Sequence, residues 1–236
     1  MTVKVRANVR NRLLANLPGS DLKRMIPHLE QVALNLGQVL YEPGARIRHC
    51  YFPNDGVVSL ITVLSPHKAT EVGMVGDEGL VGTSAAIGLE VAQHRAVVQG
   101  AGSAMRIPVA RLQREFVTCL SLHRGVLRFT HALMGQIAQT AGCNRFHTAE
   151  KRLARWLLVT RDRLRSERFH LTHRFLALMI GVRRVGVTHA AGRLAKRRLI
   201  SYNRGDVRIL DVKGLQSASC ECYEVVKDMY AKTAHS

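Results

Sequence analysis

Residues 172–200 decide the fold of this chain, and they read THRFLALMIGVRRVGVTHAAGRLAKRRLI. A compact apolar run at residues 175–180 is closed by Gly181, and a second amphipathic segment extends over about residues 183–198. Two helices joined by a turn of three or four residues that starts with Gly form a helix-turn-helix. This stretch therefore predicts a helix-turn-helix.

The second predicted helix has two different faces. Val187, Ala191 and Leu194 share one stripe and are expected to pack inward, whereas the opposite face is cationic. In a helix-turn-helix the second helix lies in the major groove, where Arg reads guanine and Thr offers a methyl and a hydroxyl. The expected DNA-contacting residues are Thr172, His173, Arg174, Arg183, Arg184, Val185, Thr188, His189, Arg193 and Lys196. The alternative interpretation is a basic solvated face without function.

Residues 199–210 follow directly and predict a β-hairpin around an Asn-Arg-Gly-Asp turn at residues 203–206. A hairpin in this position is a wing, and Arg204 at its tip is expected to reach a phosphate. The alternative is that the hairpin only covers the core of the unit.

Positive charge is concentrated in the same part of the chain. The net charge of the 236 residues is +18, and residues 144–236 supply +12 of it, with 20 Lys and Arg against eight Asp and Glu. A basic domain of this density points to a polyanionic partner, most commonly DNA or RNA. Because aromatic residues are only 5% of the chain, stacking platforms for single strands are scarce, which favours double-stranded DNA.

The region before Pro108 has a different pattern. Short runs rich in β-branched residues, such as residues 57–64, 70–75 and 96–99, alternate with turn signals such as Pro43-Gly44. This pattern predicts an antiparallel sandwich or barrel.

A helix with a regular apolar stripe is expected between these two parts. Its apolar side chains recur at steps of three and four, as a packed helix seam requires. The residues predicted to form a dimer seam are Leu122, Val126, Phe129, Leu133 and Ile137. Burial of the same stripe against the chain's own β-domain is an equally good interpretation.

The order of these parts resembles the Crp/Fnr family of bacterial transcription regulators. The resemblance rests on residues 36–44 (LGQVLYEPG), residues 76–79 (GDEG) and residues 172–200. It implies an α+β fold with three parts: a jelly-roll barrel like the cyclic-nucleotide-binding domain at 1–118, a dimerisation helix at 119–143 and a winged helix-turn-helix at 144–236. It also implies a homodimer that binds a two-fold symmetric DNA site and a barrel that senses a signal, with RNA polymerase as a candidate partner.

The family's ligand motifs are incomplete in this chain. Relatives that bind cyclic AMP hold the ribose with a Gly-Glu pair and the phosphate with an Arg followed by a hydroxyl residue. Here the corresponding candidates are Gly76, Asp77 and Glu78, followed by His94 and Arg95 without the hydroxyl. We therefore expect no cyclic nucleotide.

No metal or other cofactor is expected either. The five cysteines are scattered, none precedes Cys50, and Cys220-x-Cys222 has no second pair nearby, which is a poor zinc signature. These thiols are therefore predicted to be plain reduced cysteines.

Other classes of function are disfavoured. The sequence offers no nucleophile–base set or phosphate-binding loop, so we expect no enzyme. It offers neither a secretory signal at residues 1–12 nor a membrane span, so a cytoplasmic protein without a membrane partner is expected. The remaining alternative is a nucleic-acid-binding protein without sequence preference, either architectural or RNA-binding.

Overall fold

The computed structural model describes residues 9–65, 68–203 and 205–234. Its N-terminal part is a β-sandwich entered through α2 (Arg12–Ala15), α3 (Gly19–Met25) and the 3-10 turn η1 (Ile26–His28). All paired strands are antiparallel, in the orders β1-β7-β3 and β2-β6-β4-β5. The strands are β1 (Glu30–Leu34), β2 (Val39–Tyr41), β3 (His49–Pro53), β4 (Val57–Ser65), β5 (Lys68–Val75), β6 (Arg95–Gly100) and β7 (Gly102–Pro108).

Helices connect the sandwich to a second unit. Within and after the sandwich come α4 (Thr83–Ala86), α5 (Val109–Thr118), α6 (Leu120–Phe146) and α7 (Ala149–Leu164). The second unit contains α8 (His173–Met179), α9 (Arg184–Lys196), α10 (Val212–Ala218) and α11 (Cys222–Ala234). Its three-stranded sheet has the order β8-β10-β9, with β8 (Arg168–His170), β9 (Ile200–Asn203) and β10 (Asp206–Ile209).

Local sequence explains several of the helix boundaries. The side chains of Thr148, Thr172 and Asp211 each accept a hydrogen bond from a backbone N–H in the first turn of α7, α8 and α10, respectively. Such N-caps satisfy amide groups that have no partner within the helix. Gly181 has a φ of 60°, so the turn after α8 uses the left-handed conformation that glycine adopts without strain.

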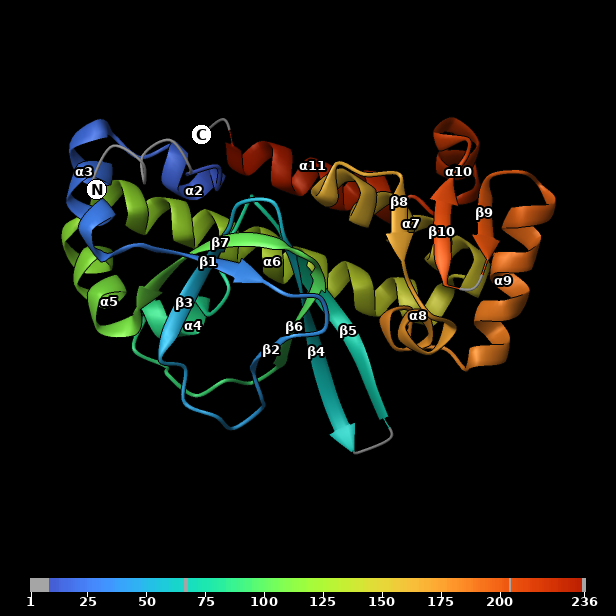
Figure 1. The fold of residues 1–236 in the computed structure, drawn as a ribbon, viewed down its shortest axis with the longest axis horizontal. Coiled ribbons are helices and arrows are strands. Elements are labelled where there is room, and N and C mark those ends of the chain that lie inside the picture. Colours follow the sequence, from blue (N-terminus) through green and yellow to red (C-terminus); the bar gives the residue numbers. More distant parts are fainter. Residues whose placement is uncertain (1–8, 66–67, 204, 235–236) are drawn as a thin grey trace.

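The long helix α6 runs behind the sandwich and reaches the second unit, and α11 returns along it toward α2 (Figure 1). Val226 and Tyr230 on α11 belong to the hydrophobic core of the sandwich. The last helix thus ties the C-terminus to the N-terminal part. None of the helices in the described part of the chain combines the length and the hydropathy that a membrane span needs.

The α+β architecture expected from the sequence is confirmed, including the order of sandwich, long helix and winged helix-turn-helix. The domain limits at 118 and 143 stay predictions, and α6 extends to Phe146. The expectation about a secretory signal concerns residues 1–12, of which residues 1–8 lie outside the described part.

Candidate functional site

The helix-turn-helix is built on a buried apolar core. Leu176 and Met179 of α8 and Val187 and Leu194 of α9 are buried together with Trp156 of α7. Arg152, also on α7, donates hydrogen bonds to the carbonyls of Ile180 and Gly181, and so fixes the turn between the two helices. The remaining face of α9 points away from this core.

Most residues predicted to contact DNA are exposed, either on α9 and its N-cap or at the start of α8. Those with exposed side chains are Thr172, Arg174, Arg183, Arg184, Val185, Thr188, His189, Arg193 and Lys196. Arg204 lies outside the described residues.

His173 is the exception, because it is half-buried. Its Nδ1 lies 3.1 Å from the Thr188 hydroxyl, and its ring stacks on Tyr202 with centroids 4.6 Å apart. This contact joins α8, α9 and the hairpin. His173 therefore positions Thr188 on the outward face.

One predicted contact is already engaged within the chain. The Arg193 Nε lies 2.6 Å from a Glu150 carboxylate oxygen, and Arg197 Nη1 lies 3.1 Å from the other oxygen. Glu150 is in the first turn of α7. Arg193 and Arg197 would therefore have to leave this carboxylate to contact a phosphate.

The sandwich contains a small cavity next to α6. Its volume is about 190 Å³, and His94 is among its lining residues, together with Gly82, Thr83 and Ser84 at the start of α4. The structure thus places a Gly-Thr-Ser sequence at this cavity, which sequence reasoning missed. Lining the cavity on the α6 side are Thr130, Leu133, Met134 and Ile137.

The structure does not bring the five predicted ligand residues together. Only His94 lines the cavity of the sandwich, where its Nδ1 lies 3.3 Å from the Thr62 hydroxyl and burial lowers its pKa. Arg95 forms an exposed ion pair with Glu42 at 2.8 Å. Gly76, Asp77 and Glu78 lie in a different place, between the sandwich, α7 and α11.

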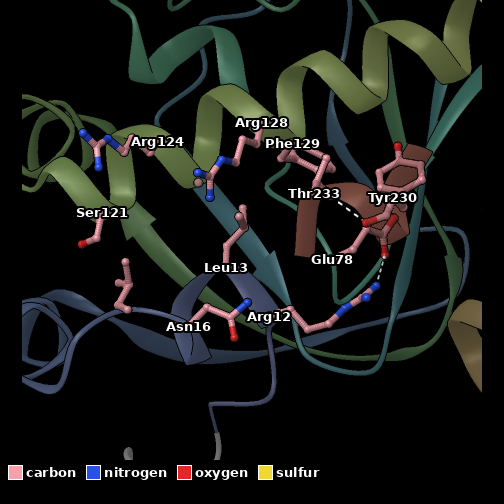
Figure 2. Close-up of a pocket in the computed structure, with 12 residues that line it drawn as sticks. Arg12, Leu13, Asn16, Glu78, Ser121, Arg124, Arg128, Phe129, Tyr230 and Thr233 are labelled. Atoms are coloured by element: carbon pink, nitrogen blue, oxygen red, sulfur yellow. Dashed lines mark hydrogen bonds and ion pairs between the residues drawn. The ribbon is translucent and has the colours of Figure 1, made fainter. Parts of the chain in front are cut away.

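The acidic pair at 77–78 is neutralised by arginines rather than open to a ligand. Asp77 contacts Arg12 and Arg165 at 3.1 and 2.8 Å, and Glu78 contacts Arg163 at 2.7 Å. Figure 2 shows Arg12 and Glu78 at one end of a groove of about 640 Å³ between α2, α6 and α11. The pair therefore holds α7 against the sandwich.

The predicted dimer seam is corrected by the structure. Leu122, Val126, Phe129 and Leu133 are buried in the hydrophobic core of the same chain, and Ile137 packs partly against it. The reason is that α6 lies between the sandwich and α11, so this stripe has partners within the chain. Of the two interpretations left open by the spacing, burial against the β-domain is the one observed for these side chains.

A different stripe of α6 is exposed. Leu120, Leu127 and Met134 recur every seven residues and have 61%, 48% and 65% of their surface exposed. A repeat of seven keeps these side chains on one face of the helix. Sequence reasoning missed this stripe because apolar residues occur on both faces of α6.

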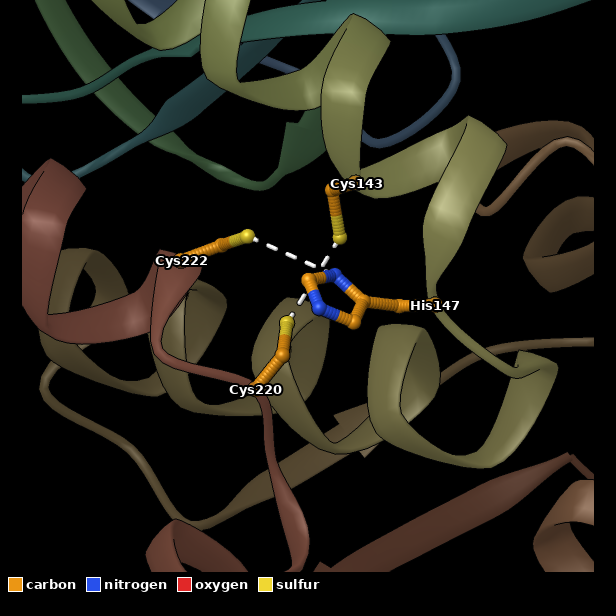
Figure 3. A group of neighbouring side chains, drawn as sticks. All are labelled: Cys143, His147, Cys220 and Cys222. Atoms are coloured by element: carbon orange, nitrogen blue, oxygen red, sulfur yellow. Dashed lines mark hydrogen bonds between the residues drawn. The ribbon is translucent and has the colours of Figure 1, made fainter.

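The expectation of no metal or cofactor site is contradicted. Cys143, His147, Cys220 and Cys222 offer ligand atoms that all lie within 4.8 Å of one another (Figure 3). A hydrogen bond from Cys220, with the nearby Arg155 guanidinium, lowers the pKa of the Cys143 thiol. This group could not be recognised from the sequence, because 77 positions separate Cys143 from Cys220. The two residues meet because α11 returns to the end of α6.

Comparison with known proteins identifies a domain family that the second unit matches. Residues 151–218 match the family model described as the Crp-like helix-turn-helix domain. No curated protein matches the chain.

Solved structures share the fold over most of the chain. FixK2 from Bradyrhizobium japonicum has a TM-score of 0.68 at 14% identity, covering 81% of this chain and 98% of that one. The c-di-GMP-responsive regulator CLP of Xanthomonas campestris has a TM-score of 0.67 at 17% identity, with 81% and 99% covered. A Crp/Fnr-family transcriptional regulator from Thermus thermophilus has a TM-score of 0.64 at 22% identity, with 83% and 98% covered. At these identities the likeness shows the fold.

Proposed function

We propose that this protein is a DNA-binding transcription regulator of the Crp/Fnr type that binds a two-fold symmetric DNA site as a homodimer. Residues 151–218 match the Crp-like helix-turn-helix domain, and the chain shares its fold with solved Crp/Fnr-type regulators, which supports the proposal. The observation that carries the proposal is the exposed, cationic outward face of α9. Regulators of this class are not enzymes, in agreement with the sequence-based expectation.

The N-terminal part of α9 would read the bases. Arg184, Val185 and Thr188 are exposed within its first two turns. Arg can donate two hydrogen bonds to guanine, and the side chains of Val and Thr can contact the methyl group of thymine. Since Val185 cannot accept a hydrogen bond from cytosine, the half-site would have no requirement for cytosine at the base pair that faces it.

The C-terminal part of α9 would contact the phosphate backbone of the DNA. Lys196 is exposed at its last turn, where a lysine contacts phosphates without reading sequence. Arg193 and Arg197 would join it once phosphates compete with Glu150. Binding should therefore weaken steeply with salt, as counterions are released from each phosphate contacted.

Homodimerisation would use the exposed stripe Leu120, Leu127 and Met134 on α6. Pairing this stripe with that of a second copy would remove three large apolar side chains from water. A two-fold axis along paired α6 helices would present two α9 helices to one face of the DNA. Half-sites one helical turn apart would match that arrangement.

The sandwich would act as a sensor without a cyclic nucleotide. No Lys or Arg is among the described residues that line its cavity, so a cyclic phosphate would find no cation there. The cavity, about 190 Å³, is also smaller than typical ligand pockets of 300–1,000 Å³. The cavity therefore suits a small effector, or no effector, better than a cyclic nucleotide. A contact with RNA polymerase and a cytoplasmic location remain part of the proposal.

Selection of bound sequences from a random duplex library tests this proposal. The full chain should enrich a palindrome at near-physiological salt with no effector added. Salt-sensitive binding to every duplex without enrichment would contradict it and would favour an architectural protein.

A further inference from the structure

Four buried or half-buried ligand groups converge where the end of α6 meets the start of α11. Cys143 lies in the last turn of α6, and His147 is the residue at which that helix ends. Cys220 precedes α11, and Cys222 is its first residue. The exposed fractions of the three cysteines are 0%, 4% and 1%, and all four side chains point toward one another (Figure 3).

The distances between these groups are those of a tetrahedral metal site. The sulfur atoms of Cys143 and Cys220 are 3.6 Å apart, and Cys222 Sγ is 3.5 Å from His147 Nδ1. Zinc bound at about 2.3 Å from sulfur and about 2.0–2.1 Å from nitrogen requires ligand separations of about 3.8 and 3.6 Å, respectively, in a tetrahedron. Three thiols and one imidazole form one of the usual structural zinc sets.

The surroundings orient the ligands as they do in zinc proteins. His147 Nε2 lies 3.1 Å from a carboxylate oxygen of Glu221, which leaves Nδ1 directed at the cysteines. Metal-binding histidines almost always donate their other ring N–H to such an acceptor. Gln139 Nε2 donates to Cys222 Sγ at 3.1 Å, a hydrogen bond that also suits a thiolate.

Buried positive charge lies beside the group. Arg152 and Arg155 on α7 are 7% and 6% exposed, and both act electrostatically on Cys143. The Nε atoms of both have no hydrogen-bond partner among the described residues. One zinc ion with three thiolates and a neutral imidazole has a net charge of −1, which a buried guanidinium would balance.

Other uses of these side chains explain less of the arrangement. A disulfide between Cys143 and Cys220 would not explain why Cys222 and the His147–Glu221 pair lie at the same place. An iron–sulfur cluster places several iron and sulfide atoms between its ligands, whereas these ligand atoms all lie within 4.8 Å of one another. The space they enclose fits one ion.

We propose that Cys143, His147, Cys220 and Cys222 bind one structural zinc ion, which clamps the end of α6 to the start of α11. The clamp closes a loop between positions 143 and 220 that contains the whole helix-turn-helix and its wing. It also lies next to Arg152, which donates a hydrogen bond to the Asn144 carbonyl and others to the turn before α9. The ion therefore fixes the position of the DNA-binding unit relative to α6.

Metal analysis of the full chain, purified under reducing conditions, tests the proposal. We expect about one zinc per chain, and cobalt(II) added after chelation should show the visible absorption bands of a tetrahedral thiolate complex. Cys220→Ala should lose both signals. Cys50→Ala and Cys119→Ala, which remove buried cysteines outside the cluster, should retain them.

A second variant avoids the core altogether. Glu221→Gln changes an exposed side chain and should weaken zinc affinity about 10- to 100-fold, because residues that hydrogen-bond to metal ligands contribute that much. Glu224→Gln, at an exposed glutamate paired with Lys227, is the matched control and should leave zinc affinity unchanged.

Three results would overturn the proposal. They are a wild-type chain that binds neither zinc nor cobalt(II), iron and sulfide in place of zinc, and a mass that shows a Cys143–Cys220 disulfide. Equal zinc affinity of the two glutamine variants would overturn the role of Glu221 in orienting His147 toward the ion.

Discussion

The indole N–H of Trp156 donates a 2.9 Å hydrogen bond to the Glu71 carboxylate, joining α7 to strand β5 of the sandwich. The Ser59 hydroxyl donates to the other carboxylate oxygen at 2.5 Å, and Glu71 is only 4% exposed. Met179 of the helix-turn-helix contacts Ser59 as well. The sandwich, α7 and the helix-turn-helix thus share a buried polar contact centred on Glu71.

Glu71 should make the stability of this junction depend on pH. Burial raises its pKa to about 7 despite the two hydrogen bonds and the nearby Arg155 and Arg163. The folded chain then holds a proton that the unfolded chain releases near pH 4.5, so the free energy of unfolding falls as pH rises from about 4.5 to 7. The free energy of unfolding should fall by roughly 1–3 kcal/mol over this pH range. Glu71→Gln should remove this dependence and raise Tm at pH 8 relative to wild type.

Thermal unfolding at pH 5.5 and pH 8 measures this effect in both chains. Glu42→Gln, at an exposed ion pair with Arg95, is a suitable control and should leave the pH dependence intact. A Glu71→Gln chain whose Tm changes with pH as steeply as that of wild type would show that Glu71 is ionised throughout.

Arg184 and Lys196 should affect DNA binding differently. Arg184→Ala should cost about 1–3 kcal/mol on the selected duplex and relax sequence preference at one position of each half-site. Lys196→Ala should weaken binding to selected and random duplexes by the same factor and reduce the salt dependence, because it removes a phosphate contact. Fluorescence anisotropy on both duplexes at two salt concentrations distinguishes these outcomes. An equal loss on random DNA for Arg184→Ala would remove it from base readout.

The exposed stripe of α6 should hold the dimer together. Met134→Glu would place a charge at an apolar position of this exposed stripe, so the mass in solution should fall from that of a dimer to that of a monomer. Val117→Glu on α5 alters a side chain that is 81% exposed and should leave the mass unchanged. Light scattering at micromolar concentration compares the two. A dimeric Met134→Glu chain would show that another surface forms the interface.

Gly79 should tolerate no side chain. A Cβ at this position would lie 2.2 Å from the Phe129 ring, and that ring is wedged between the sandwich and α11. Gly79→Ala should therefore destabilise the chain by about 1–3 kcal/mol through overpacking. Gly142→Ala in α6 meets nothing within 4 Å and should stabilise by about 0.5–1 kcal/mol. Denaturant unfolding that leaves Gly79→Ala as stable as wild type would contradict this packing.

The winged helix-turn-helix could be predicted from the sequence because its signals are local. Thr172, the apolar run before Gly181 and the small residues of α9 lie within 30 positions, and each acts on its neighbours. The short strands of the sandwich were predictable for the same reason. In both regions, local preference and tertiary packing agree.

Features that depend on distant contacts could not be predicted in this way. The metal-ligand group forms only because α11 returns to α6, and the apolar stripe at Phe129 is buried by the same helix. Periodicity shows that a face is apolar but not what covers it. The ligand candidates at Gly76–Glu78 were misplaced because acidic residues near a Gly suggested the family motif, whereas the cavity is lined by Gly82, Thr83 and Ser84.

The most direct test of a dimer that reads a symmetric site is the affinity of the full chain for two duplexes. One contains the selected palindrome, and the other contains the same half-sites moved apart by about five base pairs, half a helical turn. The second duplex should bind at least about tenfold more weakly, because one α9 helix would then face the wrong side of the DNA. Equal affinity for both duplexes, and for a scrambled one, would contradict sequence-specific binding by a two-fold dimer.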